Sequence, residues 1–394
     1  MNNAILWAIS LIFLLLPTGT SPPLLAMGVA CSIWLFSGWF LKVASDIDKM
    51  VVLPVILYIF LHWLGMLYSL DRETGMDFAM KTKYWIAFLI TAGCTMRNDG
   101  ILLIVKALWV GLVAGAILAM GQMAGLLPFI KADYPGFGIV YTLLTMYLVV
   151  GILMAAFYFK RIQNIWWKLG LVFLIAIFLF HLSVLRGRGG YVVFILASPI
   201  IASHLMYRFS LFVKILVTFS LIFALFSSPV VRGRIADTVE KIKTNRVKSI
   251  QGELIKLMPR TYMAEEALKA MKRNSIFGVG TGGLYKITEA KGRGIKHPHN
   301  NILYMGASFG LVGIASLFWL FGTMFIISWR QRQTPLGYFV LCSCLVLFLG
   351  GMFDTQILNT GTLLMLVLCY GFLCQLNRSP KSSVNSGAEE RCHI

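Results

Sequence analysis

Residues 297–313 read HPHNNILYMGASFGLVG, and in this stretch two histidines and two asparagines stand directly before a long apolar run. The run continues to about residue 328, and a helix needs about 20 such residues to cross a bilayer. Similar runs recur along the whole chain of 394 residues, which is 58% hydrophobic and only 13% charged. A soluble domain of this size cannot bury so much apolar surface. The sequence therefore predicts an all-α polytopic membrane protein.

The apolar runs predict about twelve membrane-spanning helices. Their approximate bounds are 4–20, 23–41, 51–69, 84–96, 101–120, 136–159, 167–186, 189–207, 211–228, 300–328, 336–353 and 357–376. The alternating apolar pattern that is typical of an outer-membrane barrel is absent from the sequence. The first run has no basic region before it and no small-residue cleavage site, which indicates an uncleaved span rather than a removed signal peptide.

The charges of the short connections predict the orientation of the chain. Every second connection is basic, and these are expected on the cytoplasmic side together with both termini. We therefore divide the chain into a bundle of nine spans (1–227), a large periplasmic loop (228–299), three further spans (300–376) and a cytoplasmic tail without regular structure (377–394).

The predicted loop 228–299 is itself strongly basic. It holds fifteen Lys and Arg against six Asp and Glu. A basic surface beside a membrane attracts anionic lipid headgroups or phosphorylated ligands, and no recognised nucleic-acid module is present. Apolar residues at near-helical spacing predict two helices, over 233–257 and 260–273. They either lie on the membrane surface or cover one end of the bundle.

Three arginines are candidates for anion binding. Arg186 and Arg188 lie at the outer end of a span, where arginine is costly unless it snorkels or holds an anion. If the backbone there is helical, the two side chains point to opposite sides, one to a cavity and one to headgroups. The glycines at 187, 189 and 190 would admit a ligand close to the backbone. Arg260 could grip a phosphate through two hydrogen bonds, or could be a solvated surface residue.

The opening stretch also carries the candidate for proton transfer. Pro298 favours an extended chain at His297 and a helix that begins near His299. A neutral imidazole of His299, beside Asn300 at the helix end, could accept a proton from a hydroxyl. Further along, three glycines at helical spacing predict a small-residue face for close packing, namely Gly306, Gly310 and Gly313. Histidines within or near other spans, His62, His181 and His204, are expected to be structural.

Other motifs predict little chemistry. GVGTGG at 278–283 lacks a preceding strand and a following Lys-Ser/Thr, which favours a flexible connector over a phosphate-binding loop. Six of the seven cysteines fall within apolar spans, so neither a disulfide framework nor a zinc site is expected. The sequence has no HExxH motif and no recognisable Ser-His-Asp or paired-carboxylate arrangement.

Three blocks resemble the O-antigen ligase family. In the first, His299-Asn300 is followed after nine residues by Gly310-x-x-Gly313. The second is RTYMAEEALKAMKRNSIFGVGTGG at 260–283, which is similar to the family's block of arginine, amphipathic helix and small-Gly-x-Gly. The third is RGGY at 188–191, although Gly187 stands where the family usually has serine. That departure leaves the choice between Arg186 and Arg188 open.

The resemblance implies a glycosyltransferase-C-like fold in the inner membrane of a Gram-negative bacterium. It implies transfer of O-antigen from undecaprenyl diphosphate to lipid A–core at the periplasmic face, with inversion and with neither metal nor other cofactor. His299 matches the family's general base, and Arg188 and Arg260 match the arginines that bind the donor diphosphate. Supporting roles are expected for Asn300, His297 and Asp354, of which the last is a candidate to orient a histidine or an arginine.

The implied partners are the lipid-linked donor, the lipid A–core acceptor and membrane lipids, with no nucleic acid. Two related activities remain open, an O-antigen polymerase and a protein O-oligosaccharyltransferase, because both use the same kind of donor. The modest length of the chain argues against the second. A transporter of lipid-linked sugars is an alternative of another class, but the two halves show no convincing repeat.

Overall fold

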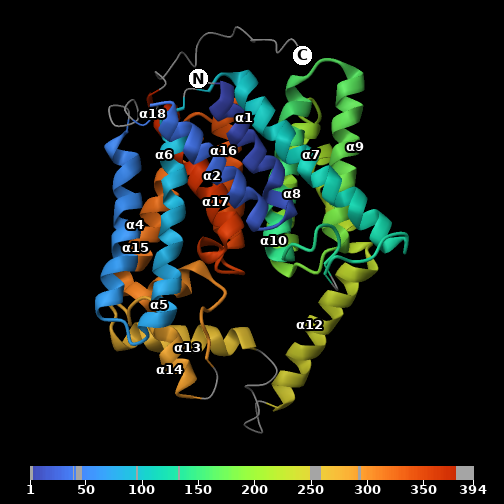
Figure 1. Cartoon of the computed structure of the whole chain (residues 1–394). Helices are drawn as coiled ribbons and strands as arrows, with labels where there is room; N and C mark the ends of the chain where they lie inside the picture. The colour runs from blue at the N-terminus through green and yellow to red at the C-terminus, as the bar shows by residue number, and fades with distance from the viewer. Residues whose placement is uncertain are drawn as a thin grey trace.

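The computed structural model of the chain describes residues 3–38, 40, 47–94, 96–131, 134–248, 259–291 and 294–378. Within this part every regular element is helical, and the long helices form one bundle (Figure 1). The helices are α1 (Asn3–Leu15), α2 (Ser21–Phe36), α4 (Lys49–Leu67), α5 (Arg72–Ala79), α6 (Ile86–Ala92), α7 (Asn98–Met123), α8 (Tyr141–Arg161), α9 (Ile165–Val184), α10 (Arg188–Leu205), α11 (Leu211–Phe226), α12 (Pro229–Lys248), α13 (Pro259–Arg273), α14 (Gly283–Glu289), α15 (Asn301–Arg330), α16 (Pro335–Gly350), α17 (Thr360–Gly371) and α18 (Leu373–Arg378). Short 3-10 helices are η1 (Leu16–Thr18), η2 (Met80–Trp85) and η4 (Gln356–Leu358).

The prediction of an all-helical polytopic membrane protein is supported, but the count of twelve spans is not confirmed. Seven of the described helices are long and apolar enough to cross a membrane, or eight if the bent pair α11–α12 forms one span. Three further predicted spans correspond to shorter apolar helices at residues 3–18, 21–36 and 335–350. The predicted span 84–96 is divided between η2 and α6, and α6 has only 7 residues. All but the first two residues of the predicted tail 377–394 lie outside the described residues.

Helix α8 lies at the centre of the bundle. Its sequence is apolar on every side, and all its residues from Leu143 to Tyr158 are buried, as expected for a helix surrounded by others. It packs against α9, α10 and α16, and α16 packs in turn against α15. The ends of α8, α10 and α16 therefore lie near one another at each end of the bundle.

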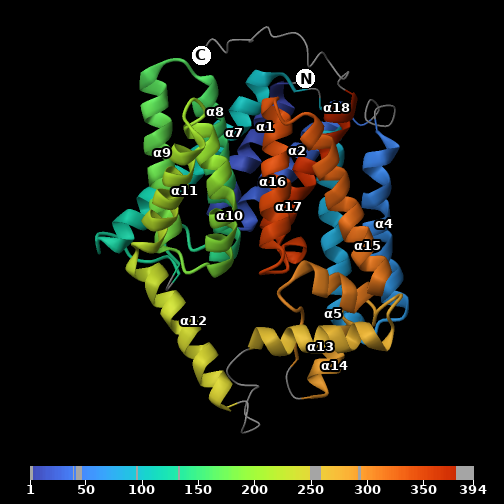
Figure 2. The same cartoon turned by 180° about the vertical axis from the view of Figure 1, so that it is seen from behind.

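Helices α13 and α14 lie across the end of the bundle opposite the start of α1 and the end of α18 (Figures 1 and 2). Helix α12 bends away from α11 by 81°. The predicted helix 260–273 is present as α13, and α12 covers the first part of the predicted helix 233–257, of which residues 249–257 lie outside the described residues. A small apolar cluster holds α13 and α14 on α15, formed by Ala267, Ala270, Val279, Leu284, Ile287 and Ala307.

The GVGTGG segment is not a flexible connector, contrary to the prediction. Its residues are buried, and Gly278, Gly280 and Gly282 all have positive φ. A Cβ at Gly278 would lie 2.5 Å from the carbonyl oxygen of Ala307, so only glycine allows this contact. Thr281 donates hydrogen bonds from its hydroxyl to the carbonyl of His62 and from its N–H to the carbonyl of Gly65. The segment is a rigid junction between α15 and α4.

Gly310 does not belong to a regular helical face, which corrects the prediction for Gly306, Gly310 and Gly313. At Gly310 the backbone is non-helical (φ 63°, ψ −148°), and α15 is broken there. At the break, backbone groups of α15 lack partners within the helix, and residues 275–280 form hydrogen bonds with them. Leu311 N–H donates to the carbonyl of Ser275, and the N–H groups of Val279 and Gly280 donate to carbonyls of α15. Because buried backbone groups need partners, the break and the segment require each other. Gly306 still packs closely on α13, against Met271.

Candidate active site

The start of α15 and the loop after α16 are joined by hydrogen bonds that fix the candidate site. Asn300 caps α15, since its Oδ1 accepts from Leu303 N–H at 3.0 Å. Its Nδ2 donates to the carbonyl of Met352 at 3.0 Å. The next residue, Asn301, donates its N–H to the carbonyl of Gly351 at 2.7 Å. These bonds hold the loop 351–359 against the residues before α15, where both candidate histidines lie.

His299 has a strained backbone. Its φ is 51°, and within the described part of the chain it is the only non-glycine residue with positive φ. That conformation is uncommon for a residue with a side chain, and such strain concentrates at functional sites. The preceding Pro298 is buried, and the cap at Asn300 begins the helix immediately afterwards. The local sequence thus turns the imidazole away from the helix and toward the loop.

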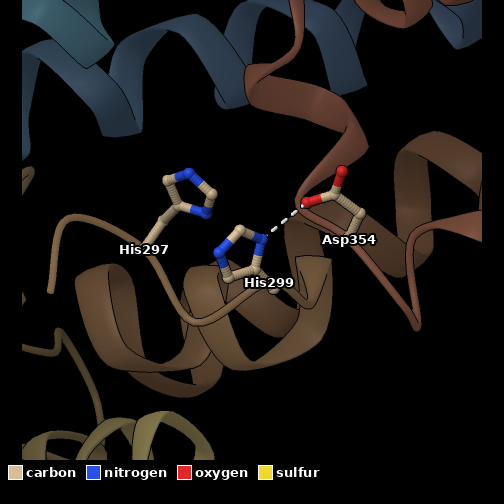
Figure 3. Close-up of side chains that lie close together, drawn as sticks. All are labelled: His297, His299 and Asp354. Carbon is tan, nitrogen blue, oxygen red and sulfur yellow. Dashed lines mark hydrogen bonds and ion pairs between the residues drawn. The ribbon is translucent and has the colours of Figure 1, made fainter. Parts of the chain in front are cut away.

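The imidazole of His299 is paired with Asp354. Nδ1 of His299 lies 2.9 Å from Oδ1 of Asp354 (Figure 3). An ionised carboxylate only accepts hydrogen bonds, so Nδ1 carries the proton and Nε2 of the neutral ring keeps its lone pair. The His299 side chain is 37% exposed and that of Asp354 is 10% exposed. The acceptor of the pair is Nε2 of His299, in a partly exposed side chain. The largely buried carboxylate of Asp354 fixes the orientation of the ring.

Asp354 is held in its ionised form by its donors. Burial alone would raise its pKa, but the hydrogen bond from His299, the nearby hydroxyl of Thr142 and the hydrogen bond from the N–H of Thr355 outweigh burial and lower the pKa to about 2. Asn359 Nδ2 adds a third hydrogen bond, to Oδ2 at 3.2 Å. Each of these partners is a donor. The pocket is accordingly built for a carboxylate and not for a carboxylic acid.

His297 lies beside His299, with ring centroids 4.5 Å apart (Figure 3). Its Nδ1 is 3.1 Å from the hydroxyl of Thr355. Burial lowers the pKa of His297 to about 4, and the neighbouring His299 acts in the same direction. His297 is therefore neutral at neutral pH and acts as a hydrogen-bonding support rather than as a second charge.

These three side chains are also a set that could hold a metal ion. One ligand atom from each of His297, His299 and Asp354 lies within 4.8 Å of the others. Two histidines and a carboxylate suit zinc or iron. A metal on Nδ1 of His299 would replace the hydrogen bond to Asp354, whereas a metal on Nε2 would take the lone pair that proton transfer needs. Metal binding and base catalysis thus compete for the same ring.

Four arginines surround a pocket that adjoins this pair. Arg186, Arg188, Arg234 and Arg260 all line it, together with Asp354. The cavity is small, ≈ 30 Å³, and its other walls come from α8, α10 and the loop after α16. Nη1 of Arg188 donates to the hydroxyl of Thr238 at 2.7 Å, which ties α10 to α12. Four guanidinium groups around one cavity make a strong site for a polyvalent anion such as a diphosphate.

The placement of Arg186 and Arg188 corrects one prediction. A helical backbone would have sent one side chain to the cavity and the other to headgroups, but that condition is not met, and both side chains line the same pocket. Helix α9 ends at Val184, and α10 begins only at Arg188. Between them Leu185 has ψ 145° and Gly187 has φ −90° and ψ 84°. In such an extended segment residues two apart point to the same side.

Gly189 and Gly190 line the arginine pocket, which is consistent with the predicted approach of a ligand to the backbone, and the glycines at 187, 189 and 190 also lie against neighbouring elements. A Cβ at Gly190 would collide with Thr145 of α8, and one at Gly189 would lie 2.8 Å from Cβ of Phe353. A Cβ at Gly187 would also crowd Thr145, at 3.0 Å. The glycines therefore also allow α10 to pack closely on α8 and on the loop after α16, and this packing positions Arg188.

Sequence reasoning missed two features of this site. Arg234 was one of many basic residues in a long loop, and only the bend between α11 and α12 brings it to the pocket. The donors around Asp354, such as Asn359, come from a loop without any motif. The other histidines lie elsewhere. His62 is buried, with Nδ1 donating to the carbonyl of Tyr58 at 2.9 Å, as expected for a structural residue.

The arrangement can remove a proton from a hydroxyl and stabilise a departing anion. Nε2 of His299 accepts the proton, Asp354 stabilises the imidazolium that results, and the arginines face the negative charge. This combination suits transfer of a group from a phosphate or diphosphate ester to a hydroxyl. The same base and anion site would serve whichever group is transferred.

Residues 171–318 match a family model described as O-Antigen ligase. The matched segment runs from α9 into α15, so it contains the four pocket arginines and His299, whereas Asp354 lies beyond it. The match supports the O-antigen ligase/polymerase superfamily and a glycosyltransferase-like role in lipopolysaccharide biosynthesis, without distinguishing ligase from polymerase. Lipid-linked polysaccharide and lipid substrates are implied in the same general sense. No curated protein matches the chain.

Proposed function

We propose that the protein is an O-antigen ligase that transfers the polysaccharide from undecaprenyl diphosphate to a sugar hydroxyl of lipid A–core. One observation carries the proposal. Asp354 both accepts a hydrogen bond from His299 and lines the pocket of four arginines, so the proton acceptor and the anion site are adjacent. A glycan transfer from a lipid diphosphate needs these two elements side by side.

In the proposed reaction, Nε2 of His299 takes the proton of the acceptor hydroxyl as its oxygen attacks the anomeric carbon of the donor glycan. The bond between that carbon and the diphosphate oxygen breaks, and the electron pair leaves with the diphosphate. Attack from the opposite side inverts the anomeric centre. The imidazolium is stabilised by the carboxylate of Asp354, since opposite charges at hydrogen-bond distance attract strongly in a partly buried site.

The arginines stabilise the charge that grows on the leaving diphosphate. A diphosphate leaves readily only if that charge is neutralised, and guanidinium groups can form paired hydrogen bonds to phosphate oxygens. We assign donor binding to Arg188 and Arg260, with Arg186 and Arg234 completing the pocket. Asp354 is ionised at neutral pH, and its carboxylate pairs with His299 at the edge of the arginine pocket.

The site is proposed to face the periplasm of a Gram-negative inner membrane. The connections at the other end of the bundle carry Lys160, Arg161, Arg208 and Arg330, and basic short connections favour the cytoplasmic side. Helices α12 and α13, with their basic residues, would then border the outer leaflet. Such a surface suits an acceptor that carries core and lipid A phosphates.

An O-antigen polymerase is the second candidate, because it would use the same donor and the same two elements. The spacing of His299-Asn300 and Gly310-x-x-Gly313 favours the ligase. To separate the two, the purified protein would be incubated with undecaprenyl-diphosphate-linked O-antigen and either rough lipopolysaccharide or lipid-linked single repeat units. The ligase proposal predicts a polymer ladder on lipid A–core. Elongation of the repeat units with no ladder on lipid A–core would instead establish polymerase activity.

A further inference from the structure

A second, larger cavity lies at the opposite end of the same helices. Its volume is ≈ 780 Å³, and it is lined by the last turns of α8, α10 and α15, by the connections that follow these helices and by α16. The other ends of α8, α10 and α16 line the arginine pocket. Helix α8 has 21 residues, and at about 1.5 Å per residue it spans about 30 Å, the thickness of the bilayer core. The two cavities therefore lie near opposite faces of the membrane.

The outer part of the large cavity is positively charged. Four of its lining residues are Lys or Arg, namely Lys160, Arg161, Arg208 and Arg332, and none of its lining residues is Asp or Glu. Aromatic rings hold several of these cations in place. The guanidinium carbon of Arg332 lies 4.8 Å from the ring centre of Trp329, and that of Arg208 lies 5.3 Å from the ring centre of Tyr207. These cations are thus kept at the mouth of the cavity without a carboxylate from its walls.

The inner part of the cavity is apolar. Leu153 lies seven residues before Lys160 on α8, which is two helical turns deeper in the bundle. Further apolar lining comes from Ile200 of α10 and from Leu341 and Leu345 of α16, which are set back from the ends of their helices. Between the two parts, Phe157 and Tyr338 stack with ring centroids 4.2 Å apart and form one wall. A ligand that fills this cavity must carry an anionic group at one end and hydrocarbon at the other.

We propose that this cavity binds one anionic phospholipid, with its phosphate between Lys160, Arg208 and Arg332 and an acyl chain along Leu153 and Leu345. Basic pockets between membrane helices recognise anionic lipid headgroups in this way. A free phosphate would bind the cations but would leave the apolar inner part of the cavity empty. The site is separate from the proposed reaction centre, because no residue is shared between the two cavities.

The test measures lipid retention by native mass spectrometry of the full-length protein. The protein is purified in detergent and mixed with equal amounts of phosphatidylglycerol and phosphatidylcholine that carry the same acyl chains. The wild type is expected to retain at least about five times as much phosphatidylglycerol as phosphatidylcholine. This ratio corresponds to a difference of about 1 kcal/mol in binding free energy between the two lipids. In the double variant Lys160→Gln/Arg332→Gln this preference is expected to disappear.

A matched control separates this site from general charge. The double variant Lys168→Gln/Arg330→Gln removes the same charge at the same end of the bundle, but neither residue lines the cavity. It is expected to keep the wild-type preference. If Lys160→Gln/Arg332→Gln aggregates, the single exchange Arg208→Gln at the exposed rim repeats the measurement.

A further measurement distinguishes a lipid phosphate from free inorganic phosphate. Millimolar inorganic phosphate is expected to leave the bound phosphatidylglycerol in place, because it cannot occupy the apolar inner part of the cavity. Displacement by inorganic phosphate would mean that the site takes a free anion, and the lipid proposal would be wrong. Equal retention of the two lipids by the wild type, or an unchanged preference in a well-folded pocket variant, would also overturn it.

Discussion

Nδ1 of His299 lies 2.9 Å from Oδ1 of Asp354, although 55 residues separate them in the sequence. The contact exists because Asn300 and Asn301 fasten the loop after α16 to the start of α15. Asp354 also lines the pocket of four arginines. A single carboxylate therefore orients the proposed base and borders the proposed donor site, and the predictions below follow from this relationship.

Asp354→Asn is expected to lower the rate of glycan transfer by about 10²-fold or more, because the amide cannot stabilise the imidazolium that forms on His299. The three hydrogen-bond partners of the carboxylate are donors, so the amide nitrogen also meets a donor wherever it turns. Transfer rates and the melting temperature would be measured together. Asp99→Asn, an exposed exchange at the start of α7, is the control and is expected to act like the wild type. An active Asp354→Asn enzyme would contradict the assigned role.

Arg234→Gln is expected to raise the KM for the lipid-linked donor about tenfold or more, since a guanidinium that pairs with phosphate contributes about 1.5–3 kcal/mol. The matched exchange is Arg232→Gln, two residues earlier on the same helix. Arg232 is exposed, donates to the carbonyl of Ser227 and does not line the pocket. Steady-state kinetics with varied donor would compare the two. Equal KM values for both variants would remove Arg234 from the donor site.

Gly310→Ala is expected to destabilise the protein by about 1–3 kcal/mol, because only glycine readily adopts its backbone conformation. The added Cβ would also overlap the backbone of Ser275 and Ile276. Gly322→Ala lies on the same helix, where nothing is within 4 Å of the added Cβ, and it is expected to leave stability unchanged. Thermal unfolding in detergent would measure both. Equal melting temperatures would mean that the break in α15 tolerates a side chain.

Acidification is expected to destabilise the folded protein partly through His297. Burial lowers its pKa to about 4, below its ordinary value of 6.5. Between these values the unfolded chain binds a proton at His297 that the folded protein does not, so stability falls as the pH is lowered from 6.5 to 4. His297→Gln removes this contribution, and its melting temperature should fall less over that range than the wild-type value. Parallel decreases would show that His297 does not titrate in this way.

The general architecture could be predicted from the sequence, because an apolar run that is long enough to cross a bilayer forms a helix. Only a helix pairs all the backbone groups of such a single run within the hydrocarbon core. The runs at 136–159 and 300–328 correspond closely to α8 and α15. The prediction was less accurate where a span is interrupted. Hydropathy does not register the transition from η2 to α6 or the break at Gly310, because both depend on contacts with distant segments.

The candidate site was predictable to the extent that single residues carried a signal. His299 stood out by its position between Pro298 and an apolar run that predicts a helix, and Arg186 and Arg188 stood out by their cost at a membrane boundary. Their mutual arrangement could not be predicted. The shared orientation of Arg186 and Arg188 depends on the non-helical backbone at Leu185 and Gly187, and the approach of Arg234 depends on the 81° bend between α11 and α12.

The most direct test of the central claim is transfer by His299→Ala, assayed with the purified protein, lipid-linked O-antigen and rough lipopolysaccharide in the presence of a chelator. The wild type is expected to keep its activity with the chelator, because the proposed reaction uses His299 as a base and the arginines as the anion site. His299→Ala is expected to fold normally and to lose about 10²–10⁴-fold in rate. His297→Ala is the neighbouring control and should retain most of the activity. A well-folded His299→Ala protein with wild-type transfer, or a wild type that the chelator inactivates, would contradict the account.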